Sequence, residues 1–397
     1  GDPKAWSVEE VGDGNLNLVF KVRGPAGGVV VKQALPYVRL VGESWPLPLS
    51  RAHYEHMALT HQARHAPGLV PEIYGYDEAM ALIVMELLEP HIIVRRGMID
   101  GIVYPDLAGT LSDFCAKTLF ATSDLALPAA DKKTLIADFA GNTALCKITE
   151  DLIFTEPYMV ADNNRWTTPH LDQMAANIRG DGDLKVAISR LKAKFVGSTE
   201  ALIHGDLHTG SLMATVEDTR VIDPEFAFVG PMGFDLGAPI ANLLLNYFSQ
   251  IGHEDAPGGR DAYRRYVLET TGAFWTGFRQ KFLALWREGA GGDVYPAALF
   301  ADPASALRLE VEREAFMDRL FQDALGFAAA KMTRRILGLA HNIDLEWIED
   351  EAVRATAEAR ALHMARSLMV DTASYRSIDA VLEAAERWNA FQPTLSA

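Results

Sequence analysis

The first part of the chain has short apolar runs whose composition and spacing predict strands. Val19–Val22 and Val29–Lys32 are rich in β-branched residues. They are separated by Gly24-Pro25 and Gly27-Gly28, a pattern that is typical of a β-hairpin. The sequence therefore predicts an antiparallel pair of strands near the start of the chain.

A helix and two more strands are expected next. A proline-punctuated loop spans Gly42 to Pro48, and Ser50 is a plausible N-cap for a helix that runs to about Arg64. Glu72 to Tyr76 and Met80 to Met85 have the composition of strands on either side of a polar turn. These elements complete a small, mostly β unit.

From about residue 105 onward, apolar residues recur at helical spacing. Leu107, Leu111, Phe114 and Leu119 follow Pro105-Asp106 in this way. Further helices are expected at residues 184–195, 238–248, 307–339 (with Gly326 as a candidate break) and 351–369, and residues 178–183 are expected to form an exposed connection.

A sheet unit followed by helices predicts an α+β fold with two lobes. We expect a small antiparallel N-terminal lobe at residues 1–88, with one main helix and a hinge near residues 85–88. A large, mostly helical C-terminal lobe is expected at residues 89–397. The cleft between two lobes is the expected place for a small-molecule site.

Composition and charge narrow the possible partners. The 397 residues have 49% hydrophobic side chains and a net charge of −16, which disfavours nucleic acid and anionic membranes as partners. An apolar run of about 18 residues, as a membrane-spanning helix needs, is not present in the sequence. The two cysteines fit a reducing compartment, and Cys115 is expected to be a buried structural thiol. We therefore expect a cytoplasmic protein.

Two polar segments in the second half suggest phosphoryl transfer. Residues 203–211 read Ile-His-Gly-Asp-Leu-His-Thr-Gly-Ser, and Asp223-Pro224-Glu225 follows a short strand at residues 220–222. Asp206 lies in a loop where it could accept a proton from a hydroxyl. Asp223 and Glu225 are carboxylates of the kind that hold Mg²⁺ against nucleotide phosphates. An isolated Asp-Pro-Glu would be an ordinary polar turn, but its position after the Asp206 loop favours the metal site.

Several residues of the first part could contact the nucleotide. Residues 12–17 include Gly14 and Asn17 beside a strand, where backbone amides can approach phosphates, although an ordinary hairpin turn has the same pattern. Lys32 ends a strand and could reach phosphates, and Glu55 could orient it. Either side chain could instead be simply solvated. The main chain of residues 86–88 could bind an adenine edge at the hinge.

The histidines and Asp235 have structural interpretations. His204 and His208 are four residues apart, but a zinc site of that spacing needs a regular helix with a Glu after the first His, and Gly205 stands there. We expect His204 to brace the loop. Asp235 is expected to hold the loop through backbone hydrogen bonds, or to cap the following helix.

Arg334 and Arg335 are adjacent within an apolar helical segment. Neighbouring helix positions diverge by about 100°, so at least one of the two should face protein or a cleft. A buried guanidinium needs an anion or another acceptor. A structural salt bridge and a substrate contact both satisfy this need.

Taken together, these residues resemble the aminoglycoside phosphotransferase and choline kinase group of protein-kinase-like folds, and within that group the 5-methylthioribose kinases. The resemblance extends over essentially the whole chain and rests on residues 12–17, 31–34, 41–47, 202–211, 221–228 and 334–341. The tryptophan loop around Trp45 and the arginine pair are its most specific parts. Ser211, where a metal-binding Asn is usual, and Asp-Pro-Glu, where Asp-Phe-Gly is usual, also resemble this subgroup.

The resemblance implies transfer of the ATP γ-phosphate to the 1-hydroxyl of 5-methylthioribose in methionine salvage, by a homodimer. It implies that Asp206 is the base and a substrate contact, that Asp223 and Glu225 bind Mg²⁺, and that Arg334 and Arg335 contact the sugar or the transition state. The remaining implied ATP contacts are Gly14, Asn17, Lys32, Glu86, Leu87, Leu88 and Pro224.

Two alternatives remain at this point. One is the same chemistry on another small alcohol, such as 5-deoxyribose, and the other is a nucleotide-binding pseudokinase without turnover. The arginine pair argues against a cationic acceptor, and the presence of Lys32, Asp206 and both later carboxylates argues against a silent module. Trp45 is a candidate to cover the substrate, although an aromatic that anchors the surface is equally compatible with the sequence.

Overall fold

The computed structural model describes residues 3–12, 16–38, 42–289 and 291–396. Its first part is built on a five-stranded antiparallel sheet in the order β1-β2-β3-β7-β6. The strands are β1 (Ser7–Glu10), β2 (Asn17–Gly24), β3 (Gly27–Ala34), β6 (Ile73–Asp77) and β7 (Leu82–Glu86). Strands β2 and β3 pair from Asn17↔Ala34 to Gly24↔Gly27, which confirms the predicted hairpin and places its turn at Pro25-Ala26.

Helix α1 (Arg51–His65) contacts this sheet and begins after Ser50, as the sequence predicted. Ser50 precedes the helix as predicted, but its side chain makes no hydrogen bond to the main-chain amides of the first turn. The expected loop at residues 42–48 is in part a strand, because β5 (Gly42–Pro46) pairs with β4 (Tyr37–Val38). That part of the prediction was wrong: prolines are tolerated at the edge of a two-stranded ribbon.

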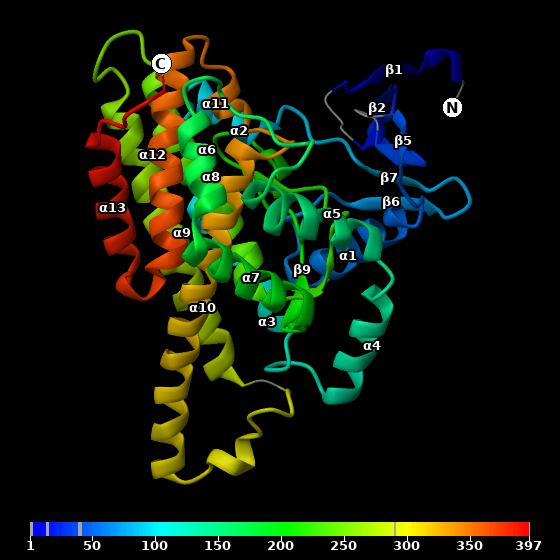
Figure 1. The fold of residues 1–397 in the computed structure, drawn as a ribbon. Coiled ribbons are helices and arrows are strands. Elements are labelled where there is room, and N and C mark those ends of the chain that lie inside the picture. Colours follow the sequence, from blue (N-terminus) through cyan, green and yellow to red (C-terminus); the bar gives the residue numbers. More distant parts are fainter. Residues whose placement is uncertain (1–2, 13–15, 39–41, 290, 397) are drawn as a thin grey trace.

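The second part is mostly helical, and Figure 1 shows it as a bundle beside the blue sheet of the first part. Its long helices are α3 (Leu107–Ala121), α7 (Gly182–Gly197), α8 (Met232–Ser249), α9 (Asp261–Glu288), α10 (Pro303–Leu337) and α12 (Glu351–Val370). Shorter ones are α2 (Val94–Ile99), α4 (Ala129–Phe139), α5 (Thr143–Phe154), α6 (Asp172–Gly180), α11 (Ile343–Glu346) and α13 (Ile378–Ala390). The predicted α+β fold with a small sheet lobe and a large helical lobe is confirmed. The boundary near residues 85–88 stays a prediction.

Helix α8 is the buried centre of the helical part. It packs against α9, α10 and α12, and all of its residues are buried. Close packing with α10 depends on small residues, because a Cβ on Gly237 would lie 2.5 Å from the main-chain oxygen of Ala324. The helix begins at Met232, six residues before the predicted start, and continues through Pro239.

Two further boundaries differ from the prediction. Helix α10 is unbroken at Gly326, where a Cβ would lie 2.8 Å from Leu191 of α7, so the glycine permits close packing and does not end the helix. The exposed connection expected at residues 178–183 is shorter than predicted, because α6 ends at Gly180 and α7 begins at Gly182, so that only Asp181 separates them. Its carboxylate caps α7 by accepting a hydrogen bond from the Leu184 amide at 3.0 Å.

Two small sheets hold the polar segments in place. Strand β9 (Ala201–Ile203) pairs with β12 (Phe228–Gly230), and β10 (Leu212–Ala214) lies between β8 (Ile92–Ile93) and β11 (Thr219–Val221). The loop with Asp206 therefore joins β9 to β10, and the loop with Asp223 and Glu225 joins β11 to β12.

Cys115 lies in the main hydrophobic core, and burial raises the pKa of its thiol well above the usual value, which confirms the expectation of a structural cysteine. Within the described residues, each helix is too short or too polar to cross a membrane.

Candidate active site

The loop after β9 is fixed by the first turn of α8. The carboxylate of Asp235 accepts hydrogen bonds from the main-chain amides of His204 (2.5 Å) and Gly205 (3.0 Å). Gly205 has a φ of 83°, and a Cβ there would lie 2.2 Å from the main-chain oxygen of Phe226. The sharp bend therefore requires glycine, and it delivers Asp206 beside the second polar loop. The expected bracing role of Asp235 is confirmed.

Lysine, histidine and arginine side chains surround the carboxylate of Asp206. Lys331 of α10 places its Nζ 2.9 Å from Oδ1, and His208 places its Nε2 3.2 Å from Oδ2. Burial by itself would raise the pKa of Asp206, but Lys331, His208 and Arg335 together hold that pKa well below its usual value. Asp206 is therefore an ionised carboxylate and a weak base.

The two histidines of this loop serve hydrogen bonding. Nε2 of His204 donates to the Ile222 carbonyl at 2.9 Å, and its Nδ1 accepts from the Asp206 amide at 3.3 Å, so it joins the two polar loops. This arrangement supports the bracing interpretation and leaves neither nitrogen of His204 for zinc. Burial lowers the pKa of His208 to about 3, so its imidazole is neutral near pH 7. Ser211 lies beside it, with Oγ 3.0 Å from Nδ1.

Lys32 connects the sheet to the second loop. Its Nζ lies 2.7 Å from Oε1 of Glu55 on α1 and also contacts the carboxylate of Asp223. Burial alone would lower the pKa of Lys32, but the two carboxylates raise it above the usual value. Asp223 has a φ of 67°, a left-handed conformation that is uncommon for residues other than glycine. This turn of the main chain directs Asp223 toward Lys32.

Three carboxylates converge at this point and could hold a cation. Oxygen atoms of Glu55, Asp223 and Glu225 lie within 4.8 Å of one another. Glu225 is buried, and its pKa is raised to about 7 by burial and by the charge of Asp223. Carboxylates as close as these repel one another, and a divalent cation with hard oxygen ligands would neutralise their charge. The residues present therefore fit Mg²⁺.

Glu225 also connects to residues near the start of β2. Asn17 donates from Nδ2 to Oε2 of Glu225 at 3.0 Å, and Nε of Arg51 lies 3.5 Å from the same oxygen. Arg51 is fully buried and donates from Nη2 to the Leu16 carbonyl (2.8 Å) and to Oδ1 of Asn17 (3.1 Å). Asn17 and Glu225, predicted separately from the sequence, are thus brought into direct contact.

The arginine pair lies at the end of α10, near Asp206. Nη1 of Arg334 and Nη1 of Arg335 both donate to the Ala340 carbonyl, at 3.1 and 3.3 Å. The Nε atoms of both are buried without a partner among the described residues. Burial lowers the pKa of Arg335 well below its usual value, and the charges of Arg334 and Arg95 lower it further. The pair therefore has unsatisfied donors and an excess of positive charge that suit an anionic group.

A third arginine, Arg95 of α2, reaches the same region. Its Nε donates to Oγ1 of Thr209 at 3.2 Å, and its Nη2 donates to Oδ1 of Asn242 at 3.0 Å. Arg95 is buried, and it faces the positive charge of Arg335. The Asp206 side of the site is thus predominantly cationic, whereas the Glu225 side is predominantly anionic.

Other predicted site residues are Gly14, Trp45 and residues 86–88. Gly14 lies outside the described residues. Trp45 is partly buried in an apolar cluster with Leu16, Leu145 and Phe226. Residues 87–89 continue from β7 without regular structure, and the Leu87 side chain lies against Gly28, where an added Cβ would approach within 2.5 Å. The adenine contact predicted for residues 86–88 stays a prediction.

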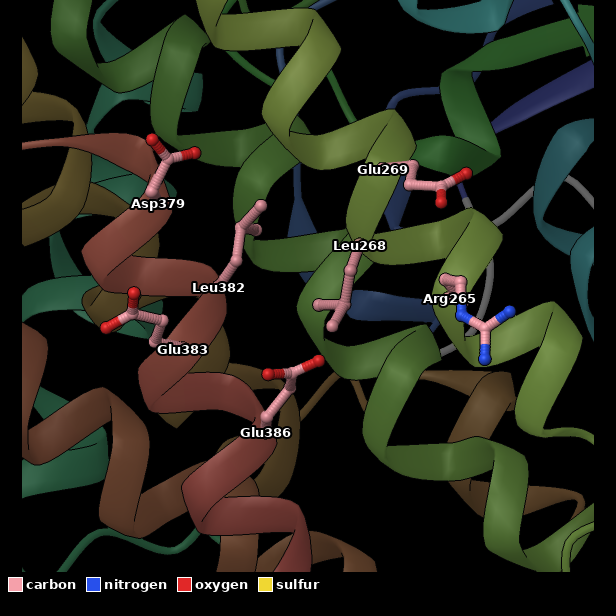
Figure 2. A pocket seen from close by; sticks show the side chains of 7 residues that line it. All are labelled: Arg265, Leu268, Glu269, Asp379, Leu382, Glu383 and Glu386. Atoms are coloured by element: carbon pink, nitrogen blue, oxygen red, sulfur yellow. The ribbon is translucent and has the colours of Figure 1, made fainter.

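A pocket of about 270 Å³ lies between α9 and α13, and Figure 2 shows that side chains such as Arg265, Glu269 and Glu386 line it. Its lining includes no residue of either polar loop. This acidic pocket is therefore separate from the candidate site.

Sequence reasoning missed Lys331, Arg95 and Arg51. Lys331 and Arg95 are basic residues within or beside an apolar helical run, the same signal that identified the arginine pair, whereas Arg51 begins a helix that is rich in polar residues. That signal could have selected Lys331 and Arg95, but their partners are distant in the chain and could not have been named.

Known proteins resemble this chain closely. Residues 7–275 match the profile of the phosphotransferase enzyme family. Methylthioribose kinase 1 of Oryza sativa subsp. japonica is 46% identical over 96% of this chain and 89% of its own length. Methylthioribose kinases of Escherichia coli O45:K1 (strain S88) and Geobacillus thermodenitrificans (strain NG80-2) are 45% and 43% identical, over 97% and 92% of this chain and 92% and 87% of their own.

Proposed function

The chain belongs to the methylthioribose kinases of the phosphotransferase enzyme family, and we propose that it transfers the γ-phosphoryl group of ATP to the 1-hydroxyl of 5-methylthioribose. It is thus a kinase of protein-kinase-like fold. The similarity to methylthioribose kinases over nearly the whole chain supports the sugar, and one observation of the site supports the chemistry. The carboxylate of Asp206 lies beside Lys331 and Arg335, and its loop is joined to the loop of Asp223 and Glu225 by the hydrogen bond from His204 to the Ile222 carbonyl.

In the proposed reaction, Asp206 orients the sugar and receives its proton. The sugar oxygen forms a bond to the γ-phosphorus while the bond from that phosphorus to the β–γ bridging oxygen breaks, and ADP leaves. The hydroxyl proton passes to the Asp206 carboxylate. Little base strength is needed because the transition state is loose and the proton moves late, which agrees with the depressed pKa of Asp206.

Charge on the transferred group is neutralised from both sides. Lys32 is held by Glu55 at 2.7 Å and would contact ATP phosphates. Asp223 and Glu225 would hold Mg²⁺, which when bound neutralises phosphate charge. Arg334 and Arg335, whose charges act on Asp206, would contact the transferred phosphoryl group through their guanidinium groups. Removing these donors would destabilise the bound transition state more than the bound substrates.

Three finer assignments belong to the same proposal. The reaction would serve methionine salvage, because that is where the resemblance places a methylthioribose kinase. A cytoplasmic location stays a prediction from the two cysteines. Two copies of the chain would form a homodimer, which is supported by exposed apolar side chains on the first half of α10, among them Leu307 and Val311.

A panel of acceptors tests the substrate. Mg²⁺-dependent ADP release is measured with 5-methylthioribose, 5-deoxyribose, ribose and choline at equal concentrations. We expect the highest kcat/KM with 5-methylthioribose and no release with choline, because the site beside Asp206 is already cationic. A higher kcat/KM with 5-deoxyribose would reassign the acceptor.

The same assay separates the enzyme from a nucleotide-binding module. Thermal stabilisation by ATP without ADP release from any acceptor would refute the proposed activity and favour a pseudokinase. As a control for the assay, the product of a positive reaction is identified as a sugar 1-phosphate by ³¹P NMR.

A further inference from the structure

Lys331 is a buried cation that contacts the candidate base directly. It lies one helical turn before Arg334 and Arg335, so the three side chains project from the same side of α10. The residue is 2% exposed, and its Nζ lies 2.9 Å from Oδ1 of Asp206. In the part of the chain that the structure describes, this carboxylate is its only hydrogen-bond acceptor. The ammonium also lies 4.3 Å from the centre of the Phe234 ring, a favourable cation–π distance.

The two partners differ in their exposure. The Lys331 side chain is 3% exposed, whereas the Asp206 side chain is 23% exposed. Lys331 therefore contacts the carboxylate from the protein interior, and the accessible part of the carboxylate stays free to meet a substrate hydroxyl. Phe234 adjoins Asp235, which accepts hydrogen bonds from the amides of His204 and Gly205. The first turn of α8 therefore contacts Lys331 and also holds the Asp206 loop.

Stability alone does not account for this pair. Two buried opposite charges lose hydration on folding, and replacing such a pair with apolar side chains is often neutral or stabilising. On α10, Lys331 is flanked by the buried Ala328, Ala329, Ala330 and Met332, and the charges of Arg334 and Arg335 oppose its own. A lysine at this position is therefore explained by what it does to Asp206.

We propose that Lys331 is a positioning residue for phosphoryl transfer, which keeps the Asp206 carboxylate ionised and aimed at the acceptor hydroxyl. The inference rests on the proposed kinase function and adds a residue to its machinery. Lys331 acts through Asp206: the ammonium holds Oδ1, so that Oδ2, which lies beside Nε2 of His208, can meet the sugar hydroxyl.

The charges around Asp206 agree with this role. Lys331 and Arg335 of α10, His208 of the same loop, and Arg95 of α2 all face the carboxylate. Against the effect of burial, Lys331 makes the largest contribution to lowering the pKa of Asp206. His208 is neutral near pH 7, so it cannot replace a lost cation. Without Lys331, the Asp206 pKa should therefore rise.

A double-mutant cycle tests the inference through kinetics. We expect Lys331→Met to lower kcat at least about tenfold at pH 7 with little change in the KM for ATP. In an Asp206→Asn background, the same change should cost less than about threefold, because the group through which Lys331 acts is already altered. Equal losses in both backgrounds would overturn the proposal and assign Lys331 a structural role.

A titration tests the inference without any substrate. The ¹³C signal of the Asp206 carboxyl group, identified by its loss in Asp206→Asn, should titrate at least about one pH unit higher in Lys331→Met than in the wild type. Lys331→Arg keeps a cation and should retain the wild-type midpoint. An unchanged midpoint in Lys331→Met would also overturn the proposal. If the wild type phosphorylated no sugar, the proposed function would fail, but this titration would still decide the role of Lys331.

Lys132 supplies the matched control. It is likewise 2% exposed, but its ammonium donates to the main-chain carbonyls of Thr122 (3.0 Å) and Glu200 (2.7 Å), away from both polar loops. We expect Lys132→Met to lower the melting temperature and to leave the Asp206 titration unchanged. If Lys132→Met shifted that titration as much as Lys331→Met, the effect would reflect general destabilisation and the proposal would be wrong.

Discussion

At the scale of single residues, the site has a mainly cationic side and a mainly anionic side. Asp206 lies among Lys331, Arg335 and Arg95, whereas Lys32 lies among Glu55 and Asp223. An ATP molecule with its cation brings negative phosphates and positive metal together, and each has a complementary side of the site to meet. This arrangement suits a reaction in which charge moves from the terminal phosphate toward ADP.

Replacing Asp206 by Asn tests the base directly. The amide is nearly the same shape but cannot accept the hydroxyl proton, so we expect at least about a hundredfold loss in kcat. ATP binding, measured by calorimetry, should be retained because Asp206 is not among the carboxylates at Lys32. Turnover close to that of the wild type would remove Asp206 from the role of base.

Arg335→Ala tests the cationic side. Arg335 is 7% exposed and its Nε has no partner among the described residues, so its loss removes an unused donor and a charge near Asp206. We expect kcat/KM for the sugar to fall at least about tenfold, with the Kd for ATP changed less than about threefold. Steady-state kinetics and nucleotide titration separate the two effects. Unchanged sugar kinetics would place Arg335 outside the site.

Residue types alone identified some members of these contacts but not their partners. The sequence pointed to Asp206, Asp223, Glu225, Lys32 and the arginine pair, because those residues occur in recognisable polar segments. It did not reveal Lys331 or Arg51, whose partners lie 125 and 174 positions away, counting to Asp206 and Glu225 (331 − 206 and 225 − 51). Such pairings depend on packing, which local sequence does not specify.

At the scale of elements, close packing decided where helices begin and continue. Gly326 was a candidate break in α10, yet the helix continues through it. Glycine suits this position because Leu191 occupies the space that a side chain would need. Helix α8 starts at Met232 although Gly233, Gly237 and Pro239 are poor helix formers. Contact with α10 requires small residues there, so tertiary packing overrides the local preference.

Helix α12 contains a buried carboxyl group whose ionisation should oppose folding. Glu358 is 1% exposed, its Oε2 has no partner among the described residues, and burial raises its pKa from 4.5 to about 7. The unfolded chain gives up this proton near pH 4.5, and the folded chain keeps it until about pH 7. The free energy of unfolding should therefore fall as pH rises between these values, by an amount on the order of 3 kcal/mol.

Glu358→Gln should remove this pH dependence, because the amide cannot ionise. Urea unfolding measures the free energy of unfolding at pH 5 and pH 8. The variant should be more stable than the wild type at pH 8 and nearly equal to it at pH 5. Glu351→Gln, at the start of the same helix with a side chain 62% exposed, is the matched control and should show no such gain. An equal gain for Glu358→Gln at both pH values would contradict the raised pKa.

At the scale of the whole molecule, the first half of α10 projects from the helical body as an arm, as Figure 1 shows in yellow. Leu299 and Leu307 are each 66% exposed, and Val311, one turn after Leu307, is 56% exposed. Single exposed apolar residues are ordinary, but several on one projecting arm suit an interface. A second copy of the chain is the occupant that we propose.

Val311→Asp tests the proposed dimer. A charge at this position would have to be buried at the interface, so we expect the variant to elute as a monomer, whereas the wild type has twice the mass of one chain. Light scattering after size exclusion measures both. Val186→Asp, at a residue 51% exposed on α7, is the matched control and should remain dimeric. If Val311→Asp also remained dimeric, the arm would not be the interface.

By itself, the sequence determined the fold class, the order of the main strands and helices, and the residue types of the two polar loops. Hydrophobic periodicity and turn residues act over short distances, so they can be recognised without a structure. Only the tertiary structure decided which polar side chains meet: Asn17 with Glu225, Lys32 with Asp223, and Lys331 with Asp206. Those contacts depend on how the sheet, α1 and α10 pack around two loops, and the electrostatics of a buried carboxylate follow from its neighbours in space.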